Sequence, residues 1–295
     1  LLAVAIVNLF LQTLILIDAS LFLHIADKII HPTYLEAISL NISRGRLFLT
    51  SYDEALIPLI FYFMIVNSEK VKKIFGTLII FLITFFALVS GFRTKILMIL
   101  FSLISLFLYK KWAGRSLVII SLIFLAMYHL YSIAPSLSLE TGIDRIVETG
   151  SEINEVTSGR FTQWQTAYDV GMSSPILGVG IGNYYDNIES SMKRSISLFR
   201  ESDRQHQMAL QNPHNIFFSL FAETGVLGLL SFTSLLAYFL KRDVQIFKTN
   251  NKLALSFVLS FWTLFIFSLL NPSQNISYQS MFWLFRAIIA SANEA

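Results

Sequence analysis

Residues 74–109 read IFGTLIIFLITFFALVSGFRTKILMILFSLISLFLY, two apolar runs separated by a short polar break. The runs cover 74–91 and 94–109, and the break contains Arg93, with Lys95 close behind it. An α-helix needs about 20 mostly apolar residues to cross the hydrocarbon core of a bilayer. The stretch therefore predicts two membrane helices joined by a tight turn, which is typical of a polytopic all-α protein.

The composition extends this prediction to the whole chain of 295 residues. Hydrophobic residues make up 55% of it and charged residues only 14%, whereas a soluble domain carries about 25% charged residues. Cysteine is absent, which excludes disulfides and thiolate metal sites. We expect an all-α transmembrane bundle of about eight spans, because six further apolar runs lie at 1–17, 53–67, 116–134, 214–240, 253–270 and 276–291.

The basic residues give this bundle an orientation. Lys and Arg gather in the cytoplasmic loops of membrane proteins, and ten of them fall on alternate loops here: Lys70, Lys72, Lys73, Lys110, Lys111, Arg115, Lys241, Arg242, Lys248 and Lys252. The chain begins at Leu1 inside an apolar run, so we expect a missing N-terminal part. The predicted organisation is helices one to five in 1–133, an extracytoplasmic loop in 134–213 and helices six to eight in 214–295.

The predicted outer loop, 134–213, is acidic, with ten acidic against six basic residues. Loops of this length usually carry function. Within it, Phe161, Trp164 and Tyr168 recur at helical spacing, and Ser158 is a suitable N-cap. The loop is therefore expected to be partly helical, with an aromatic stripe suited to the membrane–water interface.

The segment SGFRTKILMIL, residues 90–100, places Arg93 and Lys95 on the outer side, where the charge rule disfavours them. An arginine at a membrane boundary is costly and by default suggests an anionic partner. Its planar fork donates two parallel hydrogen bonds to phosphate. The alternative is an interfacial arginine that snorkels or pairs with a loop carboxylate.

The segment SSPILGVGIGNYYDN, residues 173–187, alternates Gly178, Gly180 and Gly182. A nucleotide-binding glycine loop requires a surrounding βαβ unit, and the pattern here contains none. We expect instead a tight turn that brings backbone close to another element or to a ligand.

The segment NPHNIFFSLFAETGVLGLL, residues 212–230, opens with a helix-start pattern. Asn212 is expected to be the N-cap and Pro213 the first helical residue, which puts His214 in the first turn. A helix N-terminus attracts anions, and histidine is suited to proton transfer near neutral pH. The alternative is a capping or surface histidine.

Glu223 lies nine residues after His214, which on a regular helix is the opposite face and about 13 Å deeper. We therefore expect Glu223 to pair with a polar group or cation on a neighbouring span. Gly225 and Gly228 fall near the His214 face and would let another helix approach closely.

Three segments in this order resemble the O-antigen ligase/O-antigen polymerase superfamily of bacterial polysaccharide assembly. They are SGFRTKILMIL, SGRFTQWQTAYDVGMSSPILGVGIGNYY and HNIFFSLFAETGVLGLLSF. The resemblance implies a membrane glycosyltransferase of the GT-C-like kind. Such enzymes act on glycans linked to undecaprenyl diphosphate, at the outer face of the bacterial cytoplasmic (inner) membrane.

The resemblance also implies roles for residues of this chain. Arg93 and His214 are the expected catalytic residues: Arg93 binds the diphosphate, and His214 activates the acceptor hydroxyl or orients the leaving diphosphate. Arg160 is a second anion contact. The remaining expected substrate-binding residues are Lys95, Asn215, Gly180 and Gly182. No metal or other cofactor is expected, because arginines can supply the positive charge.

Several functions remain open at this point. A polymerase is favoured by the large outer loop, a ligase acting on lipid A–core is the alternative, and a non-catalytic transporter of lipid-linked glycan represents another class. The expected partners are a lipid-linked oligosaccharide, an acceptor glycan or lipid A–core, and other polysaccharide-assembly membrane proteins, with no nucleic acid. Residues 188–211 carry no pattern that assigns them a role.

Overall fold

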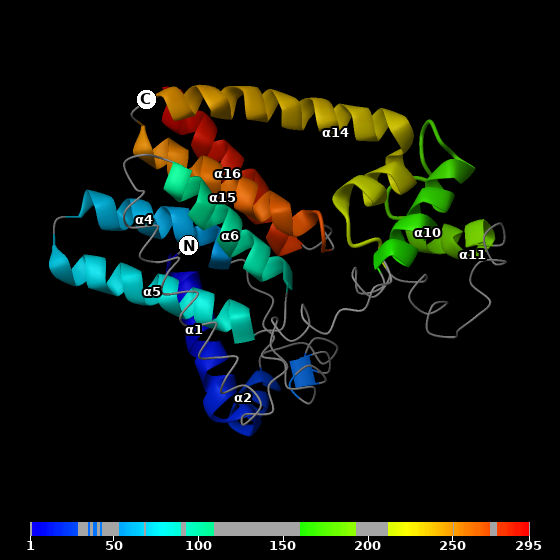
Figure 1. Ribbon diagram of the computed structural model, residues 1–295. Coiled ribbons are helices and arrows are strands. Elements are labelled where there is room, and N and C mark those ends of the chain that lie inside the picture. The colour runs from blue at the N-terminus through cyan, green and yellow to red at the C-terminus, as the bar shows by residue number, and fades with distance from the viewer. Residues whose placement is uncertain are drawn as a thin grey trace. The chain divides into compact units, whose positions relative to one another are not determined.

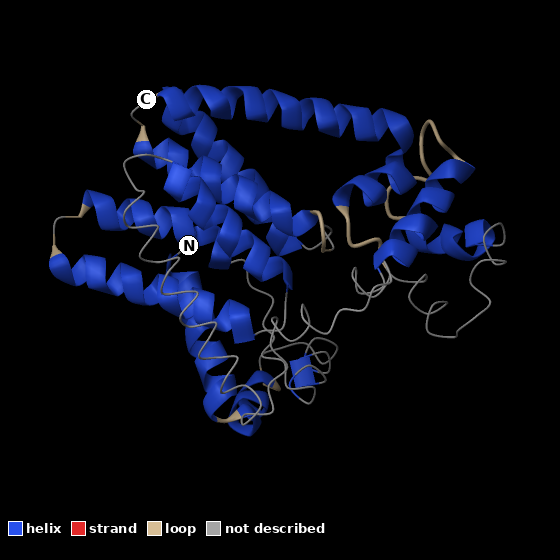
Figure 2. Ribbon diagram, in the orientation of Figure 1, coloured by secondary structure: helices blue, strands red, loops and turns tan. Residues whose placement is uncertain are grey.

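A computed structural model describes residues 2–28, 53–67, 69–89, 93–108, 160–192, 212–249, 251–271 and 276–294, with a few isolated positions between 35 and 42 (Figure 1). Every regular element within these ranges is a helix (Figure 2). The predicted all-α class is therefore confirmed for this part of the chain.

The chain forms two compact units, made of residues 1–148, 252–264 and 285–295, and of 149–251 and 265–284. The first holds α1 (Leu2–Ile17), α2 (Ala19–Ala26), η1 (Asp53–Leu56), α4 (Ile57–Val66), α5 (Lys70–Val89) and α6 (Arg93–Leu108). The second holds α10 (Arg160–Ser173), α11 (Tyr184–Met192) and α14 (Ile216–Lys248). Both units include parts of α15 (Lys252–Ser268) and α16 (Ile276–Glu294).

In the first unit, α1, α4, α5 and α6 lie within four of the apolar runs found in the sequence or overlap them closely. Pro58 lies in the first turn of α4, where its missing N–H costs nothing. The break between the two runs of the opening stretch falls between Val89 and Arg93, the ends of α5 and α6. Hydroxyls join α6 to α15, since Ser102 Oγ lies 2.8 Å from Thr263 Oγ1 in a buried contact.

Two helices in the described part are long and apolar enough to cross a membrane, Lys70–Leu88 and Ile216–Lys248. Shorter apolar helices cover Ile6–Ile17, Thr94–Ser105 and Lys252–Ser268. The count of eight spans stays a prediction. The apolar run at 116–134 and the predicted boundary between helix five and the outer loop, at 133/134, lie outside the described residues.

Arg286, the single charged side chain within the run at 276–291, is 8% exposed in α16. Its guanidinium carbon lies 4.7 Å from the centre of the Phe261 ring. A cation over an aromatic face is stabilised where water is excluded. The contact explains how α16 accommodates an arginine in an apolar segment.

Candidate functional site

Helix α10 lies beside the first part of α14, before Gly225 (Figure 1). Trp164 stacks on Phe218 with ring centres 5.8 Å apart. One turn further along both helices, Tyr168 stacks on Phe221 at 5.9 Å. Because the two ring pairs advance in step, the N-terminal ends of α10 and α14 lie together.

These stacks revise the role expected for the aromatic stripe. The structure confirms the predicted helix, but the Trp164 and Tyr168 rings pack on α14 instead of serving only the membrane interface. Phe161 is 43% exposed. Ser158, the expected N-cap, lies outside the described residues.

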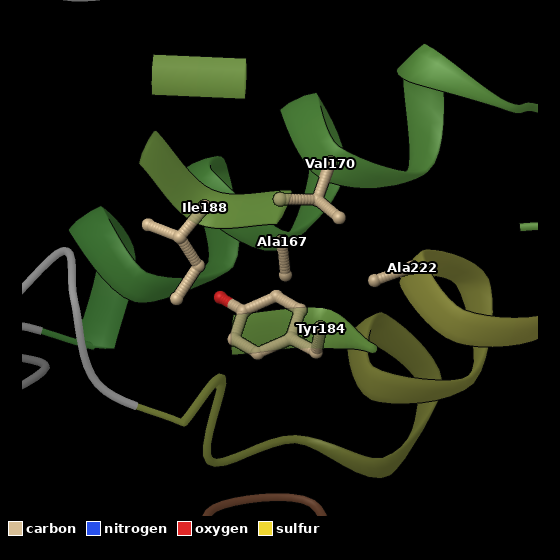
Figure 3. Packing of buried hydrophobic residues seen from close by; sticks show 5 residues of the cluster. All are labelled: Ala167, Val170, Tyr184, Ile188 and Ala222. Carbon is tan, nitrogen blue, oxygen red and sulfur yellow. The ribbon is translucent and has the colours of Figure 1, made fainter. Parts of the chain in front are cut away.

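A small apolar core holds the helix pair to α11 (Figure 3). The Tyr184 ring of α11 is 1% exposed and lies among side chains from α10 and α14. Burial raises the pKa of the Tyr184 hydroxyl, and the nearby Tyr185 and Glu223 add to this. Tyr184 therefore stays neutral and acts as a packing residue; the core consists of Ala167, Val170, Tyr184, Ile188 and Ala222.

Helix α14 begins later than the sequence suggested, and the expectation that Asn212 is its N-cap is wrong. Asn215 is the N-cap, because its Oδ1 accepts hydrogen bonds from the N–H groups of Phe217 and Phe218. The Asn215 Nδ2 donates to the Leu269 carbonyl oxygen at 2.9 Å. Asn215 thus fixes the start of α14, and its predicted substrate contact stays a prediction.

His214 lies just outside α14, not in its first turn, with a φ of 51°. Its N–H donates to Asn212 Oδ1 at 2.9 Å, which closes a turn before the helix. A left-handed φ is uncommon for a residue other than glycine, and such conformations cluster at functional sites. The turn presents His214 at the paired N-terminal ends of α10 and α14.

The surroundings of His214 set its charge. Its Nδ1 is buried and has no hydrogen-bond partner among the described residues. Burial, and after it the positive charge of Arg160, lower the pKa of His214 to about 4. The imidazole is therefore neutral near pH 7, and Arg160 lies close enough to influence it.

The structure thus brings together two of the predicted site residues, Arg160 and His214. Arg160 is the first residue of α10, and His214 lies two residues before α14. The positive dipole ends of two helices therefore lie close together here. The arrangement suits a multiply charged anion such as a diphosphate.

The glycine turn docks into a break in α14. Gly225 has φ 63° and ψ −164°, and in Figure 1 the first part of α14 and its remainder run in different directions. A break leaves backbone groups without helical partners, and these must be satisfied elsewhere. The turn supplies them through four hydrogen bonds: Val179 N–H to Ala222 O, Gly180 N–H to Glu223 O, Val226 N–H to Pro175 O and Leu227 N–H to Ile176 O.

The close approach depends on two glycines. A Cβ on Gly178 would collide with the backbone of Glu223 and Thr224. A Cβ on Gly225 would collide with the backbone of Ile176 and Gly178. The expectation that the turn brings its backbone against another element is confirmed, and the substrate contacts predicted for Gly180 and Gly182 stay predictions.

The glycine turn also provides a partner for Glu223. The Gly182 N–H donates a hydrogen bond to the Glu223 carboxylate. The partner found in the described residues is therefore backbone, where we expected a polar group or cation on a neighbouring span. The regular helix assumed from His214 to Gly228 is wrong, since His214 lies before α14 and the helix is broken at Gly225. The opposition of His214 and Glu223, and the placing of Gly228 near the His214 face, therefore stay predictions.

The other predicted pair, Arg93 and Lys95, belongs to the first unit and opens α6. Lys95 Nζ lies 3.2 Å from Glu54 Oε1, and both side chains are buried. Asp53 beside it is also buried and accepts from Asn8 Nδ2 at 3.3 Å. The Lys95 ammonium thus has a carboxylate partner inside the protein, and its contact with diphosphate stays a prediction.

Sequence reasoning did not identify Glu54 as the partner of Lys95 or Gly225 as a helix break. A signal for the first was present, since two adjacent carboxylates open an apolar run and need a cation if buried. The threonine–glycine pair in AETGVLG was the signal for the second, because glycine is the residue that adopts a left-handed conformation at little cost.

The described part of the chain is all-α, has two apolar helices of membrane-spanning length, and places Arg160 near His214 at two helix N-termini, which is typical of a helical membrane protein. A family model described as O-Antigen ligase matches residues 37–233, more than half of the chain, and the chain belongs to this family. No curated protein and no solved structure gives a significant match.

Family membership confirms the resemblance to the O-antigen ligase/polymerase superfamily. The match runs through α4, α5, α6, α10 and α11 into α14, so it includes Arg93, Arg160, the glycine turn and His214. It supports an integral membrane protein of the O-antigen ligase or polymerase type, which acts in polysaccharide assembly on lipid-linked glycan or lipid A–core.

Proposed function

We propose that the protein is a membrane glycosyltransferase that moves a glycan from undecaprenyl diphosphate to an acceptor sugar, as a surface-polysaccharide polymerase. The reaction takes place at the outer side of the bacterial cytoplasmic membrane. The observation that carries the proposal is the pairing of Arg160 with a neutral His214 at two helix N-termini. Family membership supports the reaction type.

In this proposal the diphosphate of the donor binds at Arg160, beside the positive dipole ends of α10 and α14. As the bond between the sugar and the diphosphate breaks, its electron pair moves to the diphosphate oxygen. Negative charge therefore grows where the arginine and the helix dipoles already lie, which lowers the barrier. Arg93, the first residue of α6, keeps the role that the resemblance implies, a contact with diphosphate, and its variant below tests this role on its own.

His214 accepts the proton of the acceptor hydroxyl as that oxygen forms the new glycosidic bond. A base must be unprotonated before the reaction, and the lowered pKa of His214 keeps it so. A bound diphosphate adds negative charge nearby and raises the proton affinity of the imidazole. His214 therefore becomes an effective base only when the donor is in place.

The arginines and helix N-termini supply positive charge, so we propose that the transfer needs no metal ion. The family description names a ligase, and a ligase that uses lipid A–core as acceptor is the second candidate. Both reactions use the same donor and the same leaving group. They differ in the acceptor that reaches His214.

Deletion of the gene followed by electrophoresis of the surface polysaccharide separates the candidates. Loss of long chains, with one repeat retained on the core, identifies a polymerase. Loss of all attached glycan, with lipid-linked chains accumulating, identifies a ligase. An unchanged polysaccharide pattern rejects both, including the transferase assignment.

Variants in the deletion strain test the site itself. Arg93→Ala, Arg160→Ala and His214→Ala are expected to abolish long chains while the protein level in the membrane is maintained. Glu223→Gln is expected chiefly to lower the protein level, because Glu223 binds the glycine turn. Arg242→Ala, at the opposite end of α14, serves as the control. A fully active His214→Ala variant would refute the role of His214 as base.

A further inference from the structure

Trp164 lies one helical turn after Arg160 on the same face of α10. Four residues correspond to a rise of about 6 Å, the scale of one sugar ring next to a bound diphosphate. Its indole is stacked on Phe218 with planes inclined by only 10°. The ring face is thus used for packing, and the N–H edge is the polar group that remains.

That N–H edge lacks a protein partner. The Trp164 Nε1 is buried and forms no hydrogen bond within the described part of the chain. A buried tryptophan N–H usually has a partner, and leaving a buried donor unsatisfied costs about 1–3 kcal/mol. Packing on Phe218 explains the ring but does not explain the unused donor.

His214 shows the same feature at the same end of the helix pair. Its Nδ1 is also buried without a hydrogen-bond partner in these ranges. Phe218, which stacks on Trp164, lies one turn after His214 along the chain. Two unused polar atoms thus accompany Arg160 on neighbouring segments, which suggests that a polar molecule completes the site.

We propose that Trp164 is a glycan-binding residue whose indole N–H donates a hydrogen bond to a hydroxyl oxygen of the donor sugar. This inference rests on the proposed function, since it requires a glycan carried on the diphosphate at Arg160. A sugar hydroxyl fits better than a phosphate oxygen, because a neutral single donor one turn away from the arginine adds little to the binding of charge. Trp164 would therefore distinguish donors that carry a sugar from the bare lipid diphosphate.

The test compares two lipids on the purified full chain in nanodiscs. The first is the undecaprenyl-diphosphate-linked glycan purified from the deletion strain, and the second is undecaprenyl diphosphate without sugar. Trp164→Phe removes the N–H and keeps a ring to stack on Phe218. Tyr168→Phe is the matched control, because it also keeps its stack, on Phe221, and loses one polar atom.

Loss of one neutral hydrogen bond should raise the Kd of Trp164→Phe for the glycan-linked lipid by about 3- to 10-fold. The Kd for undecaprenyl diphosphate should stay unchanged, as should both Kd values of Tyr168→Phe. Equal weakening for both lipids would overturn the inference, and so would no change for either. If the wild-type chain binds neither lipid, the proposed function fails first, and the inference fails with it.

A second measurement covers the case in which Trp164→Phe does not fold. In wild-type chain labelled with ¹⁵N-tryptophan, one of the four indole N–H signals should move downfield when the glycan-linked lipid is added. Conservative replacement of the other three tryptophans, one at a time, assigns that signal to Trp164. The same shift with undecaprenyl diphosphate, or no shift with the glycan-linked lipid, would refute the sugar contact.

Discussion

Because Glu54 and Lys95 form a buried ion pair, we expect that removing both charges lowers the folding stability less than removing one of them. The two side chains are only 2% and 5% exposed, and their charged atoms lie 3.2 Å apart. Lys95→Met leaves the Glu54 carboxylate buried without its cation, which costs about 3–5 kcal/mol of folding free energy. Glu54→Gln leaves the ammonium in the same position.

The double variant Glu54→Gln/Lys95→Met removes both buried charges, and such replacements are often close to neutral. We therefore expect a coupling energy of about 2 kcal/mol or more between the two sites. The free energy of unfolding of the purified chain, measured by denaturant titration in mixed micelles, gives this quantity. Lys72→Met is the matched control: its pair with Glu69 is 2.6 Å long but 43% and 61% exposed, so about 0–1 kcal/mol is expected.

A double variant as unstable as Lys95→Met would refute this reasoning. The same variant also tests the predicted contact of Lys95 with the substrate diphosphate. If Lys95 only neutralises Glu54, then both residues can be substituted together without loss of activity. Glycan transfer should therefore persist in the double variant. A stable but inactive double variant would assign Lys95 to the substrate.

Three further predictions concern the second unit and the reaction. Gly225→Ala should lower the melting temperature strongly, because a side chain in the left-handed backbone conformation costs about 1–3 kcal/mol and its Cβ would collide with Ile176 and Gly178. Gly182→Ala is the control, since Gly182 has φ 82° but open space around it, and it should lower the melting temperature less. Equal decreases in the two variants would contradict the docking of the turn on α14. The pKa of His214 is lowered from 6.5 to about 4, so between these values the unfolded chain binds more protons and acidification destabilises the folded protein. Melting curves of wild type and His214→Gln should therefore diverge as the pH falls below 6.5, and parallel curves would contradict a buried neutral imidazole. Glycan transfer by the purified protein should continue in EDTA; a loss that Mg²⁺ or Mn²⁺ restores would show that the arginines do not replace a metal.

The helices themselves were predictable because apolar runs and their polar flanks act locally. The runs at 53–67 and 94–109 became α4 and α6 with starts close to those expected, since Pro58 and the polar residues around Arg93 mark helix ends. Likewise, the spacing of Phe161, Trp164 and Tyr168 predicted α10. Local patterns also identified Arg160 and His214 as candidates, through a resemblance that the family match confirms.

The features missed by the sequence depend on contacts between distant segments. Asn212 and Asn215 are both plausible caps, and the choice is made by the tie from Asn215 to Leu269, 54 residues away. Gly225 reads as a helix-packing residue until the turn at 175–180 is seen to fill the break. The low pKa of His214 requires burial and a nearby Arg160, neither of which a linear pattern contains.

The docking of the glycine turn on α14 divides the turn into positions that must remain glycine and positions where the side chain can vary. Its four hydrogen bonds join backbone atoms alone, so they place no demand on the side chains that the turn carries. Ile176, Leu177 and Ile181 point away from the contact and are 65–83% exposed. Substitution at these three positions can alter the exposed surface of the turn while the glycines keep the turn docked on α14. Insertion or deletion within the turn would break this docking and should be tolerated far less.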